Sequence, residues 1–456
     1  MLFQRIVSEG LAHNSYLVGS GGKAAVIDPR RDFAIYLRVA NENGLAITHI
    51  FETHRNEDYV IGSTGLARNC GAGIFHGPGP VFSYGSSVAE GDAFTLGSLL
   101  LEIRQTPGHT EESISVVVTD REVSDRPFLV FCGDTLFAGD IARTDFYGPA
   151  RKAEMAEKIY DSITRTILTL GDGTVICPAH GAGSVCGETI ADHPFTTAGY
   201  EKQTNPLLLM GREAFIARRA AESPYFPPYF HTMEELNSRG APSPCDLPHP
   251  RPLAVAEINS LRKSGCQIVD IRSPTGFAAG HIPGSLSIWR NGLASFMGWF
   301  LDYDRPTVVV DDFDLDFGEV RRQFIRLGYD KLEGWLAGGF LAWVKAAQEI
   351  ASFPACSAAR LKERMAGEDL FILDVRDIRN REKEGFIPGS FHRYIGELPH
   401  HLDEVPRDRP VITYCDAGYK GSLAAGILTA DGYRDVANLL GGMAGWKHAG
   451  YPVGHG

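Results

Sequence analysis

Three short segments of this sequence carry side chains that can hold a metal ion. They are THRNEDY at residues 53–59, GHT at 108–110 and GDT at 133–135. Among them, His54, His109 and Asp134 offer two imidazoles and one carboxylate. A metal held on one face by such a set keeps several positions open, which suits non-haem Fe(II) that must bind two reactants together. The segments therefore indicate a metal site.

The segment around His54 resembles the metal-binding loop of the metallo-β-lactamase superfamily, whose usual form is His-x-His-x-Asp-His. His54 and Asp58 keep the first His and the Asp of that pattern, whereas Asn56 and Tyr59 replace its other two histidines. A two-zinc hydrolase needs nearly all of those groups, because each zinc takes several ligands and keeps a position open for water. This chain lacks that set.

The ligands that remain are similar to those of the persulfide dioxygenase branch of the superfamily. The resemblance implies one Fe(II) per chain on His54, His109 and Asp134, with zinc as a possible substitute. Residues 143–146 (RTDF) are similar to a signature segment of the branch. Arg143 is therefore a candidate to position an acidic substrate, although a structural ion pair is an equal alternative. A decayed motif that binds no metal is the opposing interpretation, but random loss should strike ligands indiscriminately.

Residues 177–181 (CPAHG) resemble the last metal-loop segment of the fold, in which the histidine binds a second metal in two-metal relatives. Because Tyr59 replaces one partner of that metal, we expect His180 and Asp58 to orient ligands or substrate from outside the metal sphere. A purely structural role is the alternative. The expected outer group consists of Asn56, Asp58, Tyr59 and His180.

The eight cysteines are scattered and form no CxxC pair, so neither a zinc ribbon nor a thioredoxin-type motif is indicated. In a chain without secretion signals they are expected to be reduced thiols in the cytoplasm. Cys186, shortly after the last metal-loop segment, is a candidate persulfide carrier. The alternative for Cys186 is a buried apolar residue.

The composition excludes several classes of protein. Hydrophobic residues make up 44% and charged residues 22% of the 456 residues, as in ordinary globular proteins, and this length predicts about three domains. No apolar run is long enough to span a membrane, and the N-terminus lacks the apolar core of a signal peptide. The formal net charge of −12 argues against a nucleic-acid partner.

Residues from Met1 to about Leu236 alternate strand-like and helix-like stretches. Strand-like runs lie at 23–28, 114–118 and 128–131, and residues 32–43 have a helical pattern. This alternation fits the four-layer αβ/βα sandwich that the metallo-β-lactamase resemblance implies, in which the ligands lie on loops at the edges of two sheets. Proline-dense stretches follow at 223–230 and 240–252, and we expect a linker or a wrapping arm there.

Two copies of one set of landmarks come next. The landmarks lie at 268–272, 280–285 and 334–343 in the first copy, and at 372–376, 385–390 and 440–446 in the second. Both copies resemble rhodanese domains, which implies an α/β fold with a parallel sheet flanked by helices. The predicted domains are 1–240 (metallo-β-lactamase-like), 241–355 (the first copy, without a catalytic cysteine) and 356–456 (the second copy, with Cys415).

Cys415 begins a tight loop after the strand-like run 411–414. The rhodanese resemblance implies that Cys415 carries sulfur as a persulfide. Consecutive loop N–H groups and the following helix N-terminus form an anion-binding nest, and Lys420 adds positive charge that favours the thiolate. The expected nest residues are Asp416, Ala417, Gly418, Tyr419 and Gly421. Many rhodaneses have Arg in place of Lys420, so the grip on an oxyanion is weaker here.

In the first copy, counting from Pro306 as from Pro410 places Asp311 where Cys415 lies. The loop continues as Asp312-Phe313-Asp314-Leu315-Asp316. It has no thiol, and its carboxylates would repel anionic sulfur species. We therefore expect the first copy to be catalytically silent and to serve in packing, in spacing, or in contact with a neighbouring subunit.

Together these features predict an Fe(II)-dependent persulfide dioxygenase joined to a sulfurtransferase. Its expected partners are a small thiol persulfide, dioxygen and sulfite, with thiosulfate as a product and sulfide detoxification as the role implied by resemblance. We also expect a homo-oligomer, either dimer or tetramer, without membrane or nucleic-acid partners. The alternatives are a glyoxalase-II-like zinc thioester hydrolase with a rhodanese appendage, and a non-enzymatic sulfur-relay scaffold that uses only Cys415.

Overall fold

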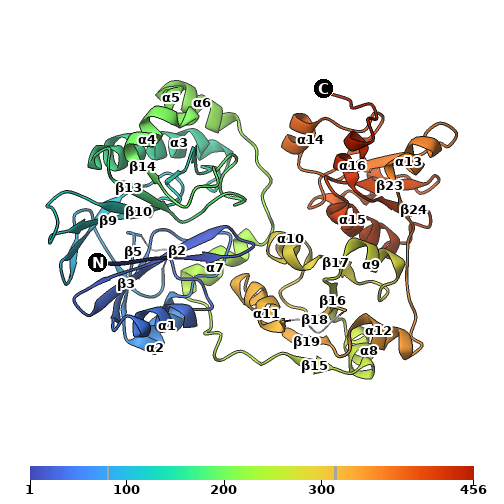
Figure 1. The fold of residues 1–456 in the computed structure, drawn as a ribbon, viewed down its shortest axis with the longest axis horizontal. Coiled ribbons are helices and arrows are strands. Elements are labelled where there is room, and N and C mark those ends of the chain that lie inside the picture. The colour runs from blue at the N-terminus through green and yellow to red at the C-terminus, as the bar shows by residue number, and fades with distance from the viewer. Residues whose placement is uncertain (80–81, 313–315, 456) are drawn as a thin grey trace. The chain divides into compact units, whose positions relative to one another are not determined.

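The computed structural model describes residues 1–79, 82–312 and 316–455 (Figure 1). The chain divides into two compact units, Met1–Leu247 with Ile325–Gly328, and Pro248–Phe324 with Tyr329–Gly456. Phe313, Asp314 and Leu315 of the predicted acidic loop lie outside the described residues. The domain boundaries at 240/241 and 355/356 stay predictions.

The first unit contains two six-stranded sheets. The first sheet has the order β1 (Leu2–Ser8), β2 (His13–Ser20), β3 (Lys23–Ile27), β4 (Ala46–Glu52), β5 (Gly73–His76), β6 (Ser86–Ser87). The second has the order β14 (Thr196–Thr197), β13 (Val175–Pro178), β10 (Leu129–Gly133), β9 (Ile114–Asp120), β8 (Leu99–Gln105), β7 (Ala93–Leu96). A separate hairpin joins β11 (Leu136–Phe137) and β12 (Asp140–Ile141).

The inner faces of these two sheets share one apolar core. Successive side chains of a strand point to opposite faces, so Val116 and Val118 of β9 enter the core between the sheets, whereas Val117 faces the other way. Ile27 of β3 and Phe51 of β4 meet them from the first sheet. The buried strands end at this core, which gives the loops that follow them a rigid base.

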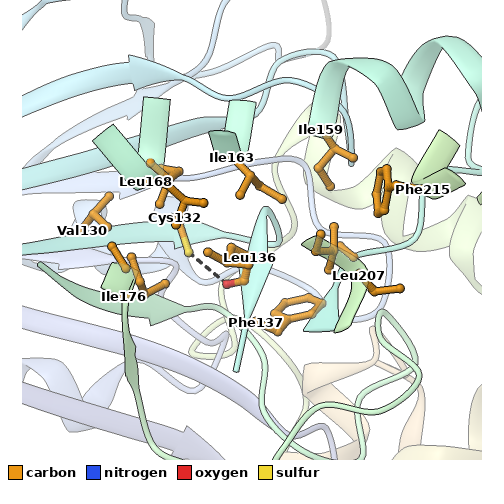
Figure 2. Close-up of a cluster of buried hydrophobic side chains, with 14 of the residues drawn as sticks. Val130, Cys132, Leu136, Phe137, Ile159, Ile163, Leu168, Ile176, Leu207 and Phe215 are labelled. Atoms are coloured by element: carbon orange, nitrogen blue, oxygen red, sulfur yellow. Dashed lines mark hydrogen bonds between the residues drawn. The ribbon is translucent and has the colours of Figure 1, made fainter. Parts of the chain in front are cut away.

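Helices cover the outer face of each sheet. α1 (Ala34–Glu42) and α2 (Ser63–Cys70) pack on the first sheet. The second sheet is covered by η1 (Pro149–Arg151), α3 (Lys152–Asp161), the π-helix η2 (Ser162–Ile167), η3 (Leu168–Leu170), α4 (Ala198–Thr204), α5 (Pro206–Leu209) and α6 (Arg212–Ala221). Figure 2 shows Ile159 and Ile163 from this layer around Cys132 of β10. The predicted four-layer αβ/βα arrangement is confirmed.

The second unit contains two five-stranded sheets with the same strand order. The first copy has β15 (Arg251–Leu253), β19 (Leu332–Leu336), β18 (Thr307–Val310), β16 (Gln267–Asp270) and β17 (Leu286–Ser287), with α8 (Val255–Lys263), α9 (Pro274–Ala279), η4 (Arg290–Gly292), α10 (Leu293–Phe300), α11 (Phe317–Arg326) and α12 (Gly339–Lys345). The second copy has β20 (Ala355–Cys356), β24 (Val436–Leu439), β23 (Val411–Tyr414), β21 (Phe371–Asp374) and β22 (Phe391–His392), with α13 (Ala358–Arg364), α14 (Ile378–Glu384), η5 (Leu398–His400), η6 (Leu402–Glu404), α15 (Tyr419–Ala430) and α16 (Gly442–His448). All pairs in both sheets are parallel, as predicted.

The two copies pack against each other through the helix that follows the Cys415 loop. α15 lies against β17 and α9 of the first copy, and the hydroxyl oxygens of Ser287 and Ser422 are 3.1 Å apart in a buried contact. The first copy therefore packs directly on the second.

Between the proline-dense stretches, α7 (Phe230–Arg239) lies within the first unit. Among the helices of the described residues, none is both long enough and apolar enough to cross a membrane.

Candidate functional site

His54 follows β4 and is held by a chain of hydrogen bonds that begins at Asp28. The Asp28 carboxylate accepts from the Thr53 backbone N–H and from its hydroxyl, both at 2.7 Å. Because the Thr53 hydroxyl donates to Asp28, it accepts from Nδ1–H of His54, 2.9 Å away. The lone pair of His54 is therefore on Nε2. Burial lowers the pKa of His54 to about 3, so the imidazole is neutral and able to bind a metal.

His109, which follows a strand of the second sheet, is also held with its Nδ1 protonated, like His54. It follows Gly108, whose φ of +142° and close approach to Ile159 leave no room for a Cβ. Nδ1 of His109 lies 2.9 Å from the carbonyl oxygen of Arg143, which can only accept, so Nδ1 carries the proton. Nε2 of His109 thus also presents a lone pair.

Asp134 brings its carboxylate to both imidazoles. It follows Gly133, whose φ of +54° suits glycine, and a Cβ there would lie 2.4 Å from the Thr53 hydroxyl oxygen. Oδ2 of Asp134 lies 3.6 Å from Nε2 of His109 and 3.9 Å from Nε2 of His54. The structure therefore brings these three buried side chains together with their donor atoms converging. Two imidazoles that present Nε2 and a carboxylate fit a divalent first-row metal.

Asp58 and His180 lie behind Asp134. Nδ1 of His180 is 2.8 and 2.9 Å from the two Asp134 oxygens, and its Nε2 is 3.0 Å from Oδ2 of Asp58. Burial disfavours a charged Asp134, but the contact with His180 outweighs it and holds the pKa of Asp134 well below its usual range. Asp134 is therefore ionised, and His180 fixes its direction.

Asn56 and Tyr59 are buried in the same loop. Nδ2 of Asn56 donates to the carbonyl oxygen of His54 at 3.3 Å, and the ring of Tyr59 lies 4.0 Å from that of His13. Asn237 of α7 clamps the loop, because its Nδ2 donates to the carbonyl oxygens of Asn56 and Tyr59 at 2.7 and 2.8 Å. Sequence reasoning missed Asn237, which lies 181 residues from Asn56 and belongs to no motif.

Glu57 is a further carboxylate at the centre that sequence reasoning missed. Its Oε2 lies 3.6 Å from Nε2 of His109, and its side chain is buried. One ligand atom each from His54, Glu57 and His109 lies within 4.8 Å of the others. Burial raises the pKa of Glu57 to about 7. An acidic residue between two residues of a metal-binding pattern is a signal that could have found it.

The Cys186 sulfur reaches the same centre. It lies within 4.8 Å of ligand atoms of Asp58 and His180, and within the same distance of ligand atoms of His109 and Asp134. Burial raises the pKa of Cys186 well above its usual value, which keeps the thiol protonated. Cys186 also belongs to an apolar cluster, which matches the alternative of a buried apolar residue, and the carrier role stays a prediction.

Arg143 forms a two-point ion pair with Asp145, Nε to Oδ1 at 2.7 Å and Nη2 to Oδ2 at 2.8 Å. Its guanidinium carbon also lies 5.1, 5.6 and 5.8 Å from three ring centroids, those of Phe146, Phe230 and Phe226. Phe146 in turn lies 5.1 Å from the ring of His109. Arg143 therefore makes the structural ion pair, and substrate positioning by this residue stays a prediction.

Cys415 lies directly after β23 and is 1% exposed. The backbone N–H of Gly418 donates to Sγ of Cys415 at 3.1 Å. Nζ of Lys420 is 2.9 Å from Oδ2 of Asp416, so its positive charge is shared with that carboxylate. The Met443 N–H at the start of α16 donates to the carbonyl oxygen of Cys415 at 2.8 Å and fixes the loop from the other side.

Of the other predicted nest residues, Ala417 lies in the loop, while Tyr419 and Gly421 belong to the first turn of α15. The Tyr419 ring is 42% exposed and lies 5.0 Å from the ring of Trp289, which belongs to the first copy. The sequence analysis missed Trp289, because the spacing of landmarks within one copy does not predict which residues contact the other copy.

Asp311 occupies the equivalent place in the first copy. Its carbonyl oxygen accepts from the Phe340 N–H at 3.0 Å, the counterpart of the bond that Met443 makes to Cys415. Its carboxylate lies 3.4 Å from Nη1 of Arg290. The first copy thus carries an ion pair at the place where the second carries a thiol.

Comparison with known proteins agrees with this division. Residues 9–180 match the family model of the metallo-beta-lactamase superfamily, and residues 254–346 and 357–449 each match that of the rhodanese-like domain. The solved structure of a metallo-beta-lactamase from Staphylococcus aureus is 31% identical, with a TM-score of 0.65, and the match covers 74% of this chain and 98% of that one. The chain belongs to the metallo-beta-lactamase superfamily and carries two rhodanese-like domains, so this prediction is confirmed.

Two curated relatives are informative for the first unit. The mitochondrial persulfide dioxygenase ETHE1 of Homo sapiens is 30% identical over 213 residues, which are 44% of this chain and 74% of that protein. Hydroxyacylglutathione hydrolase of Neisseria gonorrhoeae is 30% identical over 165 residues, which are 36% of this chain and 61% of that protein. Persulfide dioxygenase homologues together with rhodanese-like domains support an enzyme of sulfur metabolism.

Proposed function

We propose that this protein is an Fe(II)-dependent persulfide dioxygenase that carries its own sulfurtransferase domain. The observation that supports this most is the convergence of His54, His109 and Asp134, in a loop where Asn56 and Tyr59 replace the histidines of a two-zinc site. The similarity to human persulfide dioxygenase supports the same choice.

The proposed reaction converts a thiol persulfide, RSSH, with dioxygen and water into the thiol RSH, sulfite and two protons. One Fe(II) held by His54, His109 and Asp134 would supply the open-shell chemistry that lets ground-state dioxygen react with sulfur. The protein keeps both Nε2 lone pairs available, because Thr53 and Arg143 bind the Nδ1 protons.

The residues outside the triad have two proposed roles. His180 fixes the direction of the Asp134 carboxylate through the hydrogen bonds from Nδ1, and the ion pair between its Nε2 and Asp58 holds the imidazole from the other side. Cys186 takes the outer sulfur of a persulfide by exchange with its thiol, which releases RSH and leaves Cys186 as a persulfide.

The second copy is proposed to use the sulfite. The Cys415 thiolate attacks the outer sulfur of a second RSSH, releases RSH and becomes a persulfide anion. Sulfite then attacks the outer sulfur of that persulfide, which forms thiosulfate and restores the thiolate. Gly418 N–H and Lys420 stabilise the negative charge on sulfur in both steps. Both sites on one chain raise the effective concentration of sulfite at its acceptor.

An oxygen electrode with product analysis tests the proposal. Protein loaded anaerobically with one Fe(II) per chain should consume one dioxygen per sulfite formed from glutathione persulfide or coenzyme A persulfide, and the better carrier identifies the natural thiol class. His54→Ala should abolish oxygen uptake and leave Cys415-dependent sulfur transfer intact.

Two outcomes would overturn this function. Zinc-dependent cleavage of a glutathione thioester without oxygen uptake would favour the hydrolase, to which the Neisseria relative is a guide. Unchanged sulfur chemistry in His54→Ala, including sulfite formation, would favour a relay that uses Cys415 alone.

A further inference from the structure

Glu57 is the carboxylate at the metal centre for which the proposed function has no use. It lies in the loop between His54 and Asp58 and is 1% exposed. Its Oε2 is 3.6 Å from Nε2 of His109, the atom that presents a lone pair to the centre. Glu57 therefore faces the same point as the proposed ligands.

Neither carboxylate oxygen of Glu57 has a hydrogen-bond partner within the described part of the chain. Asp134, its neighbour at the centre, differs in this respect, since both of its oxygens bond to Nδ1 of His180. A buried carboxylate without hydrogen bonds costs several kcal/mol unless it is paired or binds a metal.

The basic groups nearest to Glu57 are His109 at 3.6 Å and Arg55 at 3.9 Å, and neither makes a hydrogen bond to it. The same Nη2 of Arg55 lies 3.1 Å from Oε1 of Glu234 on α7 and donates a hydrogen bond to it. Arg55 therefore makes its hydrogen bond to Glu234. Glu57 lies beside His109 of the proposed metal-binding triad without a hydrogen bond of its own.

We infer that Glu57 is a fourth protein ligand of the metal ion proposed at His54, His109 and Asp134. The inference rests on the proposed function for the presence of that ion, and it goes further in assigning the ligand set. With Glu57, four side chains of this chain would hold the ion, which would leave fewer positions open to reactants than the triad alone.

A change of Glu57 to glutamine separates a ligand from an ordinary buried residue. Glutamine keeps the shape but removes the charge and one of the two oxygens. If Glu57 is a ligand, Glu57→Gln weakens Co(II) binding by more than about 100-fold, beyond the 10–100-fold typical of groups that only orient ligands. The visible bands of bound Co(II) should also change in position and intensity, because they report the number and type of ligands.

Urea unfolding of the metal-free protein is a second test, because the two interpretations of Glu57 predict different shifts of the midpoint in Glu57→Gln. Replacing a buried carboxyl group that makes no hydrogen bond should not lower the midpoint of urea unfolding without metal, whereas loss of a structural hydrogen-bonding residue should lower it. Glu234→Gln is the matched control, since it removes the other carboxylate beside Arg55 and should leave Co(II) affinity and spectrum unchanged.

Unchanged Co(II) affinity and spectrum in Glu57→Gln would overturn the inference, as would equal effects in Glu234→Gln. Co(II) binding can be measured whether or not the protein oxidises persulfides. A wild-type protein that binds Co(II) through Glu57 but consumes no oxygen would contradict the proposed function and leave this ligand assignment in place.

Discussion

The two rhodanese copies have one framework and two different loops. Asp270 ends β16 and Asp374 ends β21, and each accepts hydrogen bonds from Nε and Nη2 of the arginine two residues later, Arg272 or Arg376. Each arginine also donates to a glycine carbonyl oxygen of the following turn, at 2.6 or 2.8 Å. The framework therefore depends on backbone and ion-pair contacts that do not involve the catalytic position.

The loops differ in charge and in partner. Cys415 accepts a hydrogen bond from Gly418 N–H and lies in a loop that carries Lys420. Asp311 at the equivalent place pairs with Arg290, and Asp312 lies 3.6 Å from Nη1 of Arg272. One loop is thus arranged to hold an anion and the other to neutralise its own carboxylates. Retention of the fold in both copies shows that the framework does not require the thiol.

The largest effect is expected at the catalytic position itself. Cys415→Ser should lower sulfur transfer from thiosulfate to cyanide by at least about a thousandfold, because a serine hydroxyl cannot carry sulfane sulfur. Asp311→Asn should leave the rate unchanged. Steady-state rates of the two variants test this, and comparable losses would show that the first copy takes part in the chemistry.

Asp311→Cys sharpens the same comparison. We expect it to stay inactive in a Cys415→Ser background, since the neighbouring carboxylates disfavour a thiolate. Recovery of sulfur transfer would mean that the framework suffices for catalysis and that only the thiol is missing.

The buried aspartates should differ in their contribution to stability. Burial raises the pKa of Asp270, and the bonds from Arg272 do not fully offset it. Burial acts on Asp374 in the same direction, but Arg376, together with the Tyr414 hydroxyl at 2.6 Å, lowers its pKa overall. Asp374→Asn should therefore lower the free energy of unfolding at pH 7 by about 3–5 kcal/mol, and Asp270→Asn by less.

The pH dependence has a defined sign. Because the folded pKa of Asp374 is lowered, its stabilisation is present above the unfolded value of about 3.9 and is lost as the pH falls through the folded pKa. The cost of Asp374→Asn should thus shrink in acid. Because the folded pKa of Asp270 is raised, its ionisation costs stability that is lost progressively as the pH rises from about 3.9 through the folded pKa, so the cost of Asp270→Asn should shrink as the pH rises. Urea unfolding at pH 7 and pH 4 measures both, and equal profiles would contradict the asymmetry.

Lys420→Ala should slow sulfur transfer by about 100–1000-fold, the range for loss of one group that stabilises developing negative charge. The effect should lie near the lower end, because Asp416 already shares the charge of Lys420. Lys447→Ala, which removes a half-buried lysine paired with Glu384, is the control and should have no effect. Lys420→Arg should lower KM for thiosulfate, since a guanidinium binds an oxyanion through two N–H groups.

Much of this architecture was predictable from local sequence. Strand periodicity gave the layers of the first unit, and repeated landmarks gave two copies with one strand order. The convergence of His54 and Asp134 followed from a motif with fixed roles. The missed residues make contacts between distant parts of the chain. Asn237 donates a hydrogen bond to Asn56, which is 181 residues away, and Trp289 of the first copy packs on Tyr419 of the second. Long-range packing of this type depends on tertiary structure, which spacing along one segment does not encode.

Glu57 lay inside the motif and was missed for another reason. Pattern matching assigns roles to positions that the family names, and residue 57 is a variable position in the pattern. Its significance comes from burial and from the lack of a hydrogen-bond partner among the described residues. Both are properties of the folded chain.

The smallest expected effect concerns Trp289, which tests whether the first copy only packs. Its ring lies 5.0 Å from Tyr419, at the start of the helix that follows Cys415. An aromatic pair contributes about 0.5–1.5 kcal/mol, so Trp289→Ala should raise KM for a bulky persulfide about 2–10-fold while kcat stays the same. Trp335→Ala is matched in size, since Trp335 stacks on Phe317 inside the first copy. If both variants leave KM unchanged, the first copy is a packing partner alone. If Trp289→Ala alone raises KM, the silent copy forms part of the entrance to the live one.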